Sequence, residues 1–316
     1  MINNRRAFIV GIKSTTLSKR EIFFLNKYKP WGVILFSRNL KEFKQIKKLT
    51  SDIRLIFKDK KYPIFIDQEG GRVNRLSKLI EASIFSAEFF GNLYNKNKHK
   101  FINYYKIYIN QVSYLLNELG INVNTVPVLD VKKTKSKNII GDRSYSSLPK
   151  NVSEIGDFCI EEFKKYKIGT VIKHIPGHGL TKIDSHKKTP IVKFNYKYLY
   201  KNAFFPFKNK KSFFAMTAHI IYKNIDSTNT ATHSTKIIKL IRKKIGFKNI
   251  IISDDISMKA LKGNIKINTL RAISAGCNLI LHCNADYAEM RIVAENSPLV
   301  NSFIIKKTSQ FYNFLS

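Results

Sequence analysis

The chain has 316 residues, which is enough to bury a large hydrophobic core in one large domain or two small ones. It carries 56 Lys and Arg against 22 Asp and Glu, a formal net charge of +34, and 44% of its residues are hydrophobic, an ordinary fraction for a globular protein. No apolar run reaches transmembrane length, and Ala7–Ile12 is too short for a signal-peptide core, so we expect a soluble, cytoplasmic protein without a membrane partner.

Apolar runs of strand length recur along the chain and are separated by amphipathic stretches. The eight runs are Ala7–Ile12, Trp31–Phe36, Tyr62–Ile66, Val123–Leu129, Thr170–Ile172, Phe213–Thr217, Ile250–Ile252 and Cys277–Leu281. They are rich in Val, Ile and Phe and do not alternate strictly with polar residues. This composition is typical of parallel strands that are buried on both faces.

Helical periodicity fills the segments between these runs. In the clearest helix, apolar residues recur at three- and four-residue steps and Gly120 supplies a stop signal. Its apolar positions are Phe101, Tyr105, Tyr108, Val112, Leu115 and Leu119. The other segments that suit helices are Lys41–Phe57, Val152–Tyr166, Ser234–Ile245 and Ile265–Ala275.

Eight strand–helix units in a chain of this length predict an α/β fold, a (β/α)8 TIM-type barrel that forms a single domain over residues 1–316. The alternative is a doubly wound open sheet, but no Gly-x-Gly-x-x-Gly turn follows the first strand. Polar residues that follow or close an apolar run favour the barrel, whose active sites lie at the carboxyl ends of the strands. These residues are Asp67, Asp130, Lys173, His174, His219, Asp254 and His282.

The high positive charge allows two interpretations. A pI near 10 is typical of proteins that bind nucleic acid or membrane surfaces. Lysines are, however, spread along the whole chain together with abundant Asn and Ile, which indicates compositional drift. We therefore expect no specific nucleic-acid partner. The three cysteines, Cys159, Cys277 and Cys283, show no metal-ligand spacing and are expected to be reduced thiols in the interior.

A histidine-rich segment carries the densest group of titratable residues. Lys173-His174-Ile175-Pro176-Gly177-His178-Gly179 is followed by Asp184-Ser185-His186. In an extended loop, residues i and i+2 point the same way, so Asp184 can hold one imidazole nitrogen of His186 while the other faces a substrate. The alternative is a glycine-rich connector in which the histidines occur by chance.

Together with three further blocks, this segment resembles family 3 glycoside hydrolases, in particular the bacterial β-N-acetylhexosaminidase branch of cell-wall recycling. The blocks are Asp67-Gln68-Glu69-Gly70-Gly71-Arg72-Val73-Asn74-Arg75, then Pro127-Val128-Leu129-Asp130 with Gly141-Asp142-Arg143-Ser144-Tyr145, and Ser253-Asp254-Asp255-Ile256-Ser257-Met258. The resemblance runs from about Trp31 to about Cys283. Several unrelated motifs in the same order are more specific than any single motif.

The resemblance implies a role for each matching residue. Asp254 is the nucleophile that forms a glycosyl–enzyme ester, and His186, supported by Asp184, is the general acid/base. The implied substrate contacts are Asp67, Arg75, Arg143, Lys173 and His174. A histidine near pKa 6.5 can both donate and accept a proton at neutral pH, and an adjacent carboxylate stabilises the imidazolium. No cofactor and no metal are expected.

Other charged residues of the same motifs have open roles. Asp255 is expected to cap the turn that follows it rather than to react. Glu69 and Arg72 are expected to be structural rather than to contact the substrate; ion pairs of Arg72 and Arg75, for example with Glu69, are one such role. For Asp130 two roles are equally supported: it orients Arg143, or it binds the sugar.

The remaining histidines have weaker assignments. His178 is expected to stiffen its own loop, and His219, at a strand end, to line the pocket. His282 is expected to be a core histidine with satisfied hydrogen bonds.

By resemblance, the chain is a monomeric retaining exo-β-N-acetylglucosaminidase. Its expected substrate is the peptidoglycan-derived disaccharide GlcNAc-1,6-anhydro-MurNAc, with or without peptide. A family 3 β-glycosidase of other sugar specificity, or a phosphorylase, is the alternative within glycoside chemistry. A basic polyanion-binding protein is the alternative from another class, and it would require clustered basic and aromatic residues.

Overall fold

The computed structural model describes residues 2–132, 139–181, 183–185 and 187–316. Eight parallel strands form a closed barrel in the order β1-β10-β9-β7-β5-β4-β3-β2. They are β1 (Arg6–Gly11), β2 (Pro30–Leu35), β3 (Ile64–Ile66), β4 (Val123–Asn124), β5 (Gly169–Ile175), β7 (Phe214–Thr217), β9 (Ile250–Asp255) and β10 (Leu279–His282). Each strand lies within or overlaps one predicted apolar run, so the predicted (β/α)8 barrel is confirmed.

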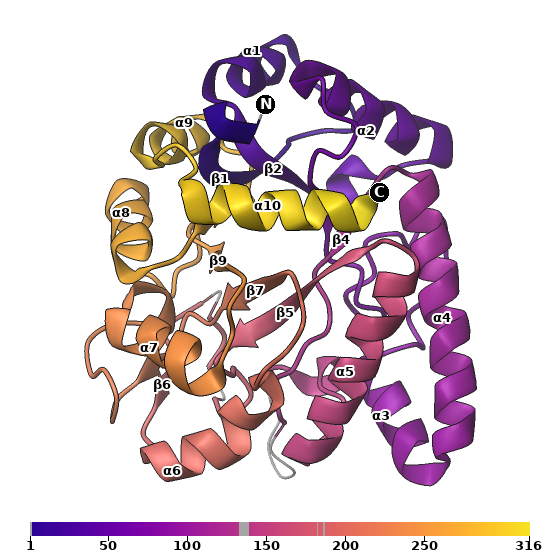
Figure 1. Ribbon diagram of the computed structural model, residues 1–316, viewed down its shortest axis with the longest axis vertical. Coiled ribbons are helices and arrows are strands. Elements are labelled where there is room, and N and C mark those ends of the chain that lie inside the picture. Colours follow the sequence, from indigo (N-terminus) through magenta and orange to yellow (C-terminus); the bar gives the residue numbers. More distant parts are fainter. Residues whose placement is uncertain (1, 133–138, 182, 186) are drawn as a thin grey trace.

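Helices surround the barrel (Figure 1). They are α1 (Lys19–Tyr28), α2 (Phe43–Phe57), α3 (Ala87–Lys96), α4 (Lys98–Glu118), α5 (Pro149–Lys165), α6 (Tyr196–Leu199), α7 (Thr235–Leu240), α8 (Ile265–Ala275), α9 (Tyr287–Asn296) and α10 (Ser302–Leu315). A short two-stranded sheet of β6 (Ile191–Val192) and β8 (Ile221–Tyr222) lies outside the barrel order. The sequence predicts the helices α2, α4, α5, α7 and α8. The other helices were not predicted.

Local sequence signals fix where the helices begin and end. Ser18 caps α1 in a capping box, because its hydroxyl accepts a hydrogen bond from the Glu21 amide while the Glu21 carboxylate accepts one from the Ser18 amide. Asn97 caps α4 by accepting from the Lys100 amide. Gly120 follows the end of α4 with a φ of 70°, a left-handed conformation that glycine adopts without strain. The predicted stop is therefore confirmed.

Two apolar layers stabilise this arrangement. The outer layer packs between the strands and the helices, and the inner layer fills the barrel with side chains such as Ile9, Phe65, Val171 and Ile252. Large aliphatic and aromatic residues fill the barrel interior, so it is a packed core and not a channel.

Helix α10 crosses the amino-terminal end of the barrel (Figure 1). The Trp31 indole donates a 2.9 Å hydrogen bond to the Thr308 hydroxyl, and the Phe311 ring lies 5.2 Å from the ring of Phe214. Gly169 begins β5 beneath this helix, where a Cβ atom would lie 2.7 Å from the Phe311 ring. Apolar packing of α10 therefore covers the amino-terminal end of the barrel.

Candidate active site

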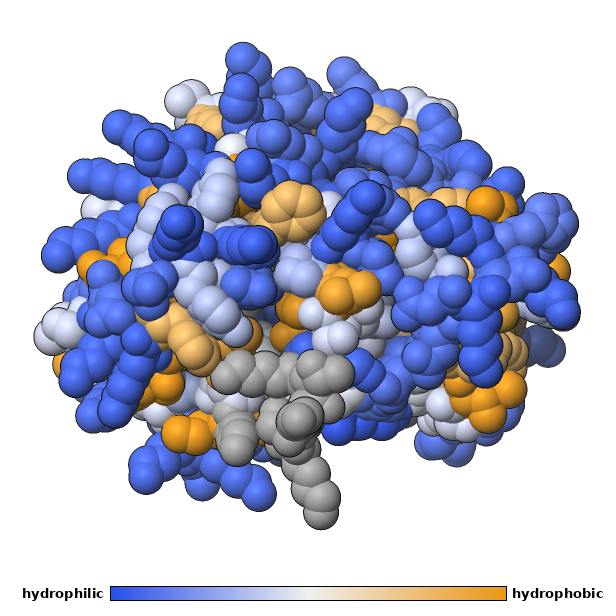
Figure 2. Space-filling view, turned by 90° about the horizontal axis from the view of Figure 1, so that it is seen from below, coloured by the Kyte–Doolittle hydropathy of each residue, from blue (hydrophilic) through white to orange (hydrophobic). Residues whose placement is uncertain are grey.

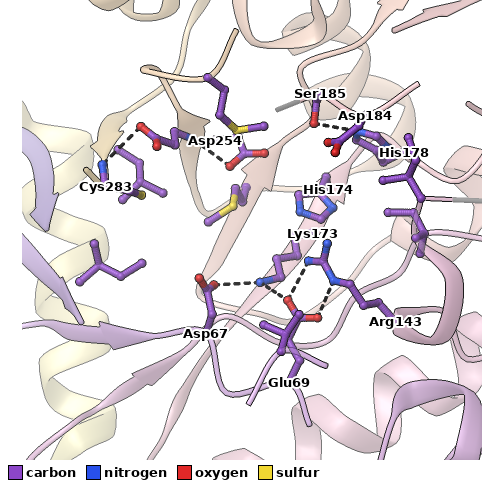
Figure 3. Close-up of a pocket in the computed structure, with 18 of the residues that line it drawn as sticks. Asp67, Glu69, Arg143, Lys173, His174, His178, Asp184, Ser185, Asp254 and Cys283 are labelled. Carbon is purple, nitrogen blue, oxygen red and sulfur yellow. Dashed lines mark hydrogen bonds and ion pairs between the residues drawn. The ribbon is translucent and has the colours of Figure 1, made fainter. Parts of the chain in front are cut away.

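A cavity of about 240 Å³ lies at the carboxyl ends of the barrel strands (Figure 3). All seven of the predicted site residues that the structure describes line it: Asp67, Arg75, Arg143, Lys173, His174, Asp184 and Asp254. The eighth, His186, lies outside the described residues. Motifs that are far apart in sequence therefore meet at one place, as the barrel prediction required.

The first charged group in the cavity centres on Asp67, which directly follows β3. Its Oδ1 accepts a 3.0 Å hydrogen bond from the Lys173 ammonium and another from the Thr125 hydroxyl, and its Oδ2 lies 3.4 Å from Nη2 of Arg75. Burial alone would raise the pKa of Asp67, but Lys173 and Arg75 hold this pKa below its ordinary value. Asp67 is therefore an ionised acceptor at neutral pH.

A tight turn brings Arg75 to Asp67. Gly70 has a φ of 89° and Gly71 a φ of 57°, and the Glu69 amide donates a 3.0 Å hydrogen bond to the Val73 carbonyl. A Cβ atom on Gly71 would lie 2.8 Å from the Cβ of Ser86. The two glycines therefore allow the chain to reverse between the acidic and basic ends of this motif.

Glu69 forms the second charged group. Its carboxylate accepts two hydrogen bonds from the Arg143 guanidinium, at 2.7 and 2.8 Å, and lies 2.7 Å from the Lys173 ammonium. Burial would raise the pKa of Glu69, yet Arg143 and Lys173 lower it to about 2. Arg72 forms an ion pair as expected, but with Asp142 at 3.2 Å at the more exposed surface and not with Glu69. Glu69 forms buried ion pairs and also lines the cavity. A buried carboxylate needs buried cations, and Arg143 and Lys173 supply them.

Asp254 lies at the end of β9 and faces the cavity (Figure 3). Its Oδ1 accepts a 2.8 Å hydrogen bond from the amide of Asp255. Burial would raise the pKa of Asp254, but His219, His174 and this amide lower it. Asp255 itself accepts from the amide and hydroxyl of Ser257. The expected capping role of Asp255 is confirmed, and this side chain lines the cavity as well.

Asp130 has neither of its two expected roles, because its hydrogen bonds go elsewhere. It is completely buried, and its Oδ2 lies 2.7 Å from Nδ1 of His174. The amides of His174 and His178 also donate to this carboxylate, at 3.3 and 2.5 Å. Asp130 does not line the cavity. The segment after β5 folds back over this carboxylate, which places it behind His174 rather than beside Arg143.

His178 joins its own loop to the loop of Asp184, as expected of a residue that stiffens the segment. Its Nε2 lies 3.2 Å from the Ser185 hydroxyl (Figure 3). Burial and the neighbouring His174 lower the pKa of His178 to about 4, although Asp130 and Asp254 act in the opposite direction. His178 is therefore neutral at pH 7.

The segment that contains Asp184 is held by backbone hydrogen bonds on both sides. The Asp184 carbonyl accepts from the amides of Lys187 and Lys188, at 3.0 and 2.9 Å, and the Ser185 carbonyl accepts from the Ala260 amide at 3.1 Å. Asp184 lines the cavity. Its expected pairing with His186 lies outside the described residues.

The other histidines and the cysteines separate into buried and cavity-lining groups. His219 is completely buried and does not line the cavity, so this expectation is wrong; its ring nitrogens contact the Thr232 hydroxyl and the Asp255 carbonyl. His282 is buried as expected and its Nε2 lies 2.9 Å from Glu289, but its buried Nδ1 has no hydrogen-bond partner among the described residues, so the expectation of a fully satisfied histidine is wrong. Cys159 and Cys277 are buried as expected, whereas Cys283 is partly exposed and lines the cavity.

The apolar wall of the cavity was not part of the prediction. It includes Phe36, Met216, Met258 and Leu281. Their position at or just beyond the ends of predicted strands was the available signal, since those ends meet at one rim in a parallel barrel. Within the described ranges, no group of three or more His, Cys, Asp or Glu side chains could hold a metal ion. In the same ranges, no helix is both long and apolar enough to cross a membrane.

These features limit the chemistry of the site. Asp254 is an ionised carboxylate in a partly apolar cavity, where it can attack an electrophilic carbon or stabilise a positive charge. The charged groups around Asp67 and Glu69 offer both donors and acceptors, as a polyhydroxylated ligand requires. The low pKa values of Glu69 and His178 make both poor general acids near neutral pH, because Glu69 is then a carboxylate and His178 a neutral imidazole.

Comparisons with known proteins agree with this geometry. The model of the glycosyl hydrolase family 3 N-terminal domain matches residues 11–309. The chain is 34% identical to a β-hexosaminidase of Haemophilus ducreyi and 30% identical to one of Nitrosomonas eutropha, in each case over 87% of this chain and 80% of the relative. The crystal structure of NagZ from Neisseria gonorrhoeae in complex with N-trifluoroacetyl-D-glucosamine superposes with a TM-score of 0.87 at 25% identity, over 99% of this chain and 90% of the other. The chain therefore belongs to glycosyl hydrolase family 3 and is a glycoside hydrolase.

Proposed function

We propose that this protein is a retaining exo-β-N-acetylglucosaminidase that removes terminal N-acetylglucosamine from 1,6-anhydro-N-acetylmuramoyl muropeptides. The observation that carries the proposal is the position of Asp254. It is an ionised carboxylate at the end of β9, in the cavity whose other residues include the linked Asp67, Lys173 and Glu69. A nucleophile and a hydroxyl-binding group in one small cavity fit the terminal sugar of a glycoside.

In the proposed reaction, Asp254 attacks the anomeric carbon and forms a covalent glycosyl ester, while the glycosidic bond to the leaving sugar breaks. Water then attacks the same carbon from the opposite face and releases the ester, so the configuration is inverted twice and the product keeps its β-configuration. The side chains that contact the sugar hydroxyls are Asp67, Arg75, Arg143, Lys173 and His174.

We assign the acid/base role to His186 with Asp184 as its partner. His186 gives a proton to the leaving oxygen in the first step and accepts a proton from water in the second. The position of Asp184 in the cavity supports this assignment, and so do the low pKa values of Glu69 and His178, which make these two less suitable as the acid. Both roles follow from the motif that contains these two residues.

The sugar preference and the biological setting extend the proposal. Two relatives are named β-hexosaminidases, and a structural neighbour holds N-trifluoroacetyl-D-glucosamine. The apolar wall formed by Phe36, Met216 and Leu281 offers contact for an acetyl methyl group. We further propose a cytoplasmic monomer, formed by one barrel domain over residues 1–316, that acts in peptidoglycan recycling.

A paired assay tests the activity. The chromogenic β-N-acetylglucosaminide should be cleaved far faster than the matching β-glucoside, and the fragment GlcNAc-1,6-anhydro-MurNAc should release N-acetylglucosamine. Preference for the glucoside would contradict the sugar assignment. A rate that requires added inorganic phosphate, with a sugar phosphate as product, would identify a phosphorylase.

Two further measurements test the mechanism. Proton NMR of the fresh product should show the β-anomer, and an α-anomer would exclude a covalent intermediate on Asp254. A fluorinated sugar with a good leaving group should leave a mass adduct on a peptide that contains Asp254. Retention without such an adduct would point to catalysis assisted by the substrate itself.

A further inference from the structure

Asp130 is a buried carboxylate that the proposed mechanism does not use. It follows Leu129, just beyond β4, and is 0% exposed. Three donors surround it: the amide of His174 at 3.3 Å, the amide of His178 at 2.5 Å, and Nδ1 of His174 at 2.7 Å from Oδ2. Burial of a carboxylate is costly without such partners, so these donors are what stabilise the buried carboxylate of Asp130.

The charge state of Asp130 sets the proton position on His174. Burial would raise the pKa of Asp130, but contacts with His174 and His178 lower it, so the carboxylate is ionised at neutral pH. An ionised carboxylate only accepts hydrogen bonds. At 2.7 Å, Nδ1 of His174 must therefore carry a hydrogen atom. In the neutral ring Nε2 is then an acceptor with a free lone pair.

The other edge of the His174 ring belongs to the cavity. His174 lines the cavity (Figure 3), whereas Asp130, which is hydrogen-bonded to Nδ1 of the ring, does not. In that view the ring lies between Lys173 and the group of Asp184 and His178. With Nδ1 held by Asp130, Nε2 is the ring nitrogen left to meet a ligand.

We propose that Asp130 is a positioning residue, which holds His174 as the Nδ1–H tautomer so that Nε2 accepts a hydrogen bond from a hydroxyl group of the terminal sugar. The identity of the ligand as a sugar rests on the proposed function, whereas the assignment of the His174 tautomer does not. Through the amide of His178, the same carboxylate also fixes the loop that contacts Ser185. One buried charge thus orients a side chain that faces the ligand and the backbone beside it.

Nitrogen NMR of the wild-type protein, labelled with ¹⁵N-histidine, tests the tautomer directly. His174, assigned by the signal that is missing in His174→Gln, should show a protonated Nδ1 and an unprotonated Nε2 at pH 7.5. In Asp130→Asn the amide can donate to Nδ1, and the ring should change to the Nε2–H tautomer. A wild-type ring with the proton on Nε2 would overturn the proposal, whether or not any variant folds.

Kinetics then separate positioning from a purely structural role. Asp130→Asn should lower kcat/KM roughly 10- to 100-fold, the scale seen when an outer partner of a site histidine is lost. In a His174→Gln background, Asp130→Asn should lower kcat/KM by less than about threefold, because its effect acts through His174. Equal losses in both backgrounds would overturn the proposal.

Asp226→Asn is the matched control. Asp226 is also a buried carboxylate with several donors, from Thr228, Asn229 and Ser234, and it does not line the cavity. This variant should be less stable but keep the wild-type kcat/KM and the wild-type tautomer of His174. If wild-type protein has no N-acetylglucosaminidase activity, the proposed function fails, while the NMR result still decides the role of Asp130.

Discussion

The two ends of the barrel use the same eight strands in opposite ways. At the amino-terminal end, Phe214 packs edge to face against Trp31 and against Phe311 of α10, with ring centroids 5.7 and 5.2 Å apart. At the carboxyl end, Lys173 and Glu69 bring charges into a cavity of about 240 Å³. The first end removes apolar surface from water, which stabilises the fold. The second desolvates charges, which contributes little net stability even when they are well paired.

This contrast separates stability from catalysis within one molecule. Removal of an aromatic ring at the amino-terminal end should lower the free energy of unfolding and leave the active site unchanged in the folded protein. Substitution of a residue proposed to react at the carboxyl end, such as Asp254, should lower activity and change the free energy of unfolding little. The face seen in Figure 2 is largely hydrophilic.

The largest effect is expected for Asp254→Asn at the carboxyl end. Asparagine keeps the shape of the side chain but cannot form the glycosyl ester, so kcat should fall on the order of 10⁴-fold or more. Steady-state assays with an aryl N-acetylglucosaminide and a thermal unfolding curve check both halves of this statement. The melting temperature should remain close to that of the wild type.

The neighbouring acid provides the control for this variant. Asp255→Asn removes a carboxylate of the same strand end, and should cost far less activity because Asp255 serves to cap the Ser257 turn. Comparable losses in both variants would mean that the nucleophile has been assigned to the wrong residue.

The largest effect on stability is expected for Phe311→Ala at the opposite end. Phe311 is completely buried, and its truncation should lower the free energy of unfolding by about 3–5 kcal/mol. Denaturant titration measures this, while kcat/KM at a temperature where the variant is folded should stay within about twofold. Phe23→Ala is the matched control, because Phe23 is 58% exposed and its loss should change stability by less than about 0.5 kcal/mol.

His186→Ala tests the acid/base assignment. With a poor leaving group, kcat/KM should fall roughly 100-fold or more, because the leaving oxygen must be protonated. An activated aryl glycoside needs no such proton in the first step and should lose much less. Equal losses on both substrates would contradict the assignment and would leave the acid to be found elsewhere in the cavity.

The strands were predictable because a closed parallel barrel buries both faces of each strand. Apolar runs such as Trp31–Phe36 and Ile250–Ile252 therefore contain little besides aliphatic and aromatic residues. Helix α10 was not predicted, since its role follows from tertiary packing against Trp31 and Phe214 rather than from a strand–helix repeat.

Site positions were predictable from motifs, whereas their partners depended on which way each side chain faces. Asp67 and Glu69 lie two residues apart and share the ammonium of Lys173, a pairing that their spacing could have predicted. For Asp130, the partner His174 follows from the bridge between Val128 and Lys173, which sets the segment after β4 beside β5.

Acid titration should reveal how much Glu69, at the carboxyl end of the barrel, contributes to the free energy of unfolding. Its folded-state pKa of about 2 lies below the ordinary value of 4.5, so its contribution to stability is present above pH 4.5 and is lost as the pH falls toward 2. In Glu69→Gln, the loss of stability between pH 6 and pH 3 should be smaller by roughly 1–2 kcal/mol. Denaturant midpoints at the two pH values measure this difference.

The exposed ion pair of Lys47 and Glu118 supplies the control for that titration. Its side chains are 58% and 42% exposed, and such pairs contribute little to stability. In Glu118→Gln, the free energy of unfolding should therefore differ between pH 6 and pH 3 by as much as it does in the wild type. If Glu69→Gln also kept it, the network around Lys173 would not carry the acid sensitivity of the fold.

The smallest effect is expected for Ser185→Ala, which tests whether the hydrogen bond to His178 holds the Asp184 loop at the cavity. The hydroxyl lies 3.2 Å from Nε2 of His178, and one such bond is worth about 0.5–1.5 kcal/mol. The loop keeps its backbone link to Ala260, so the melting temperature should hardly change. Turnover of a substrate with a poor leaving group should fall by about 2- to 10-fold, with a smaller loss for an activated one, because the proposed acid/base segment is less well placed.

A double variant provides the control for this contact. Adding His178→Ala to Ser185→Ala should lower turnover less than His178→Ala alone lowers it in the wild type, since the bond is already absent. Fully additive losses, or an equal loss on both substrates, would show that this contact does not position the acid/base loop.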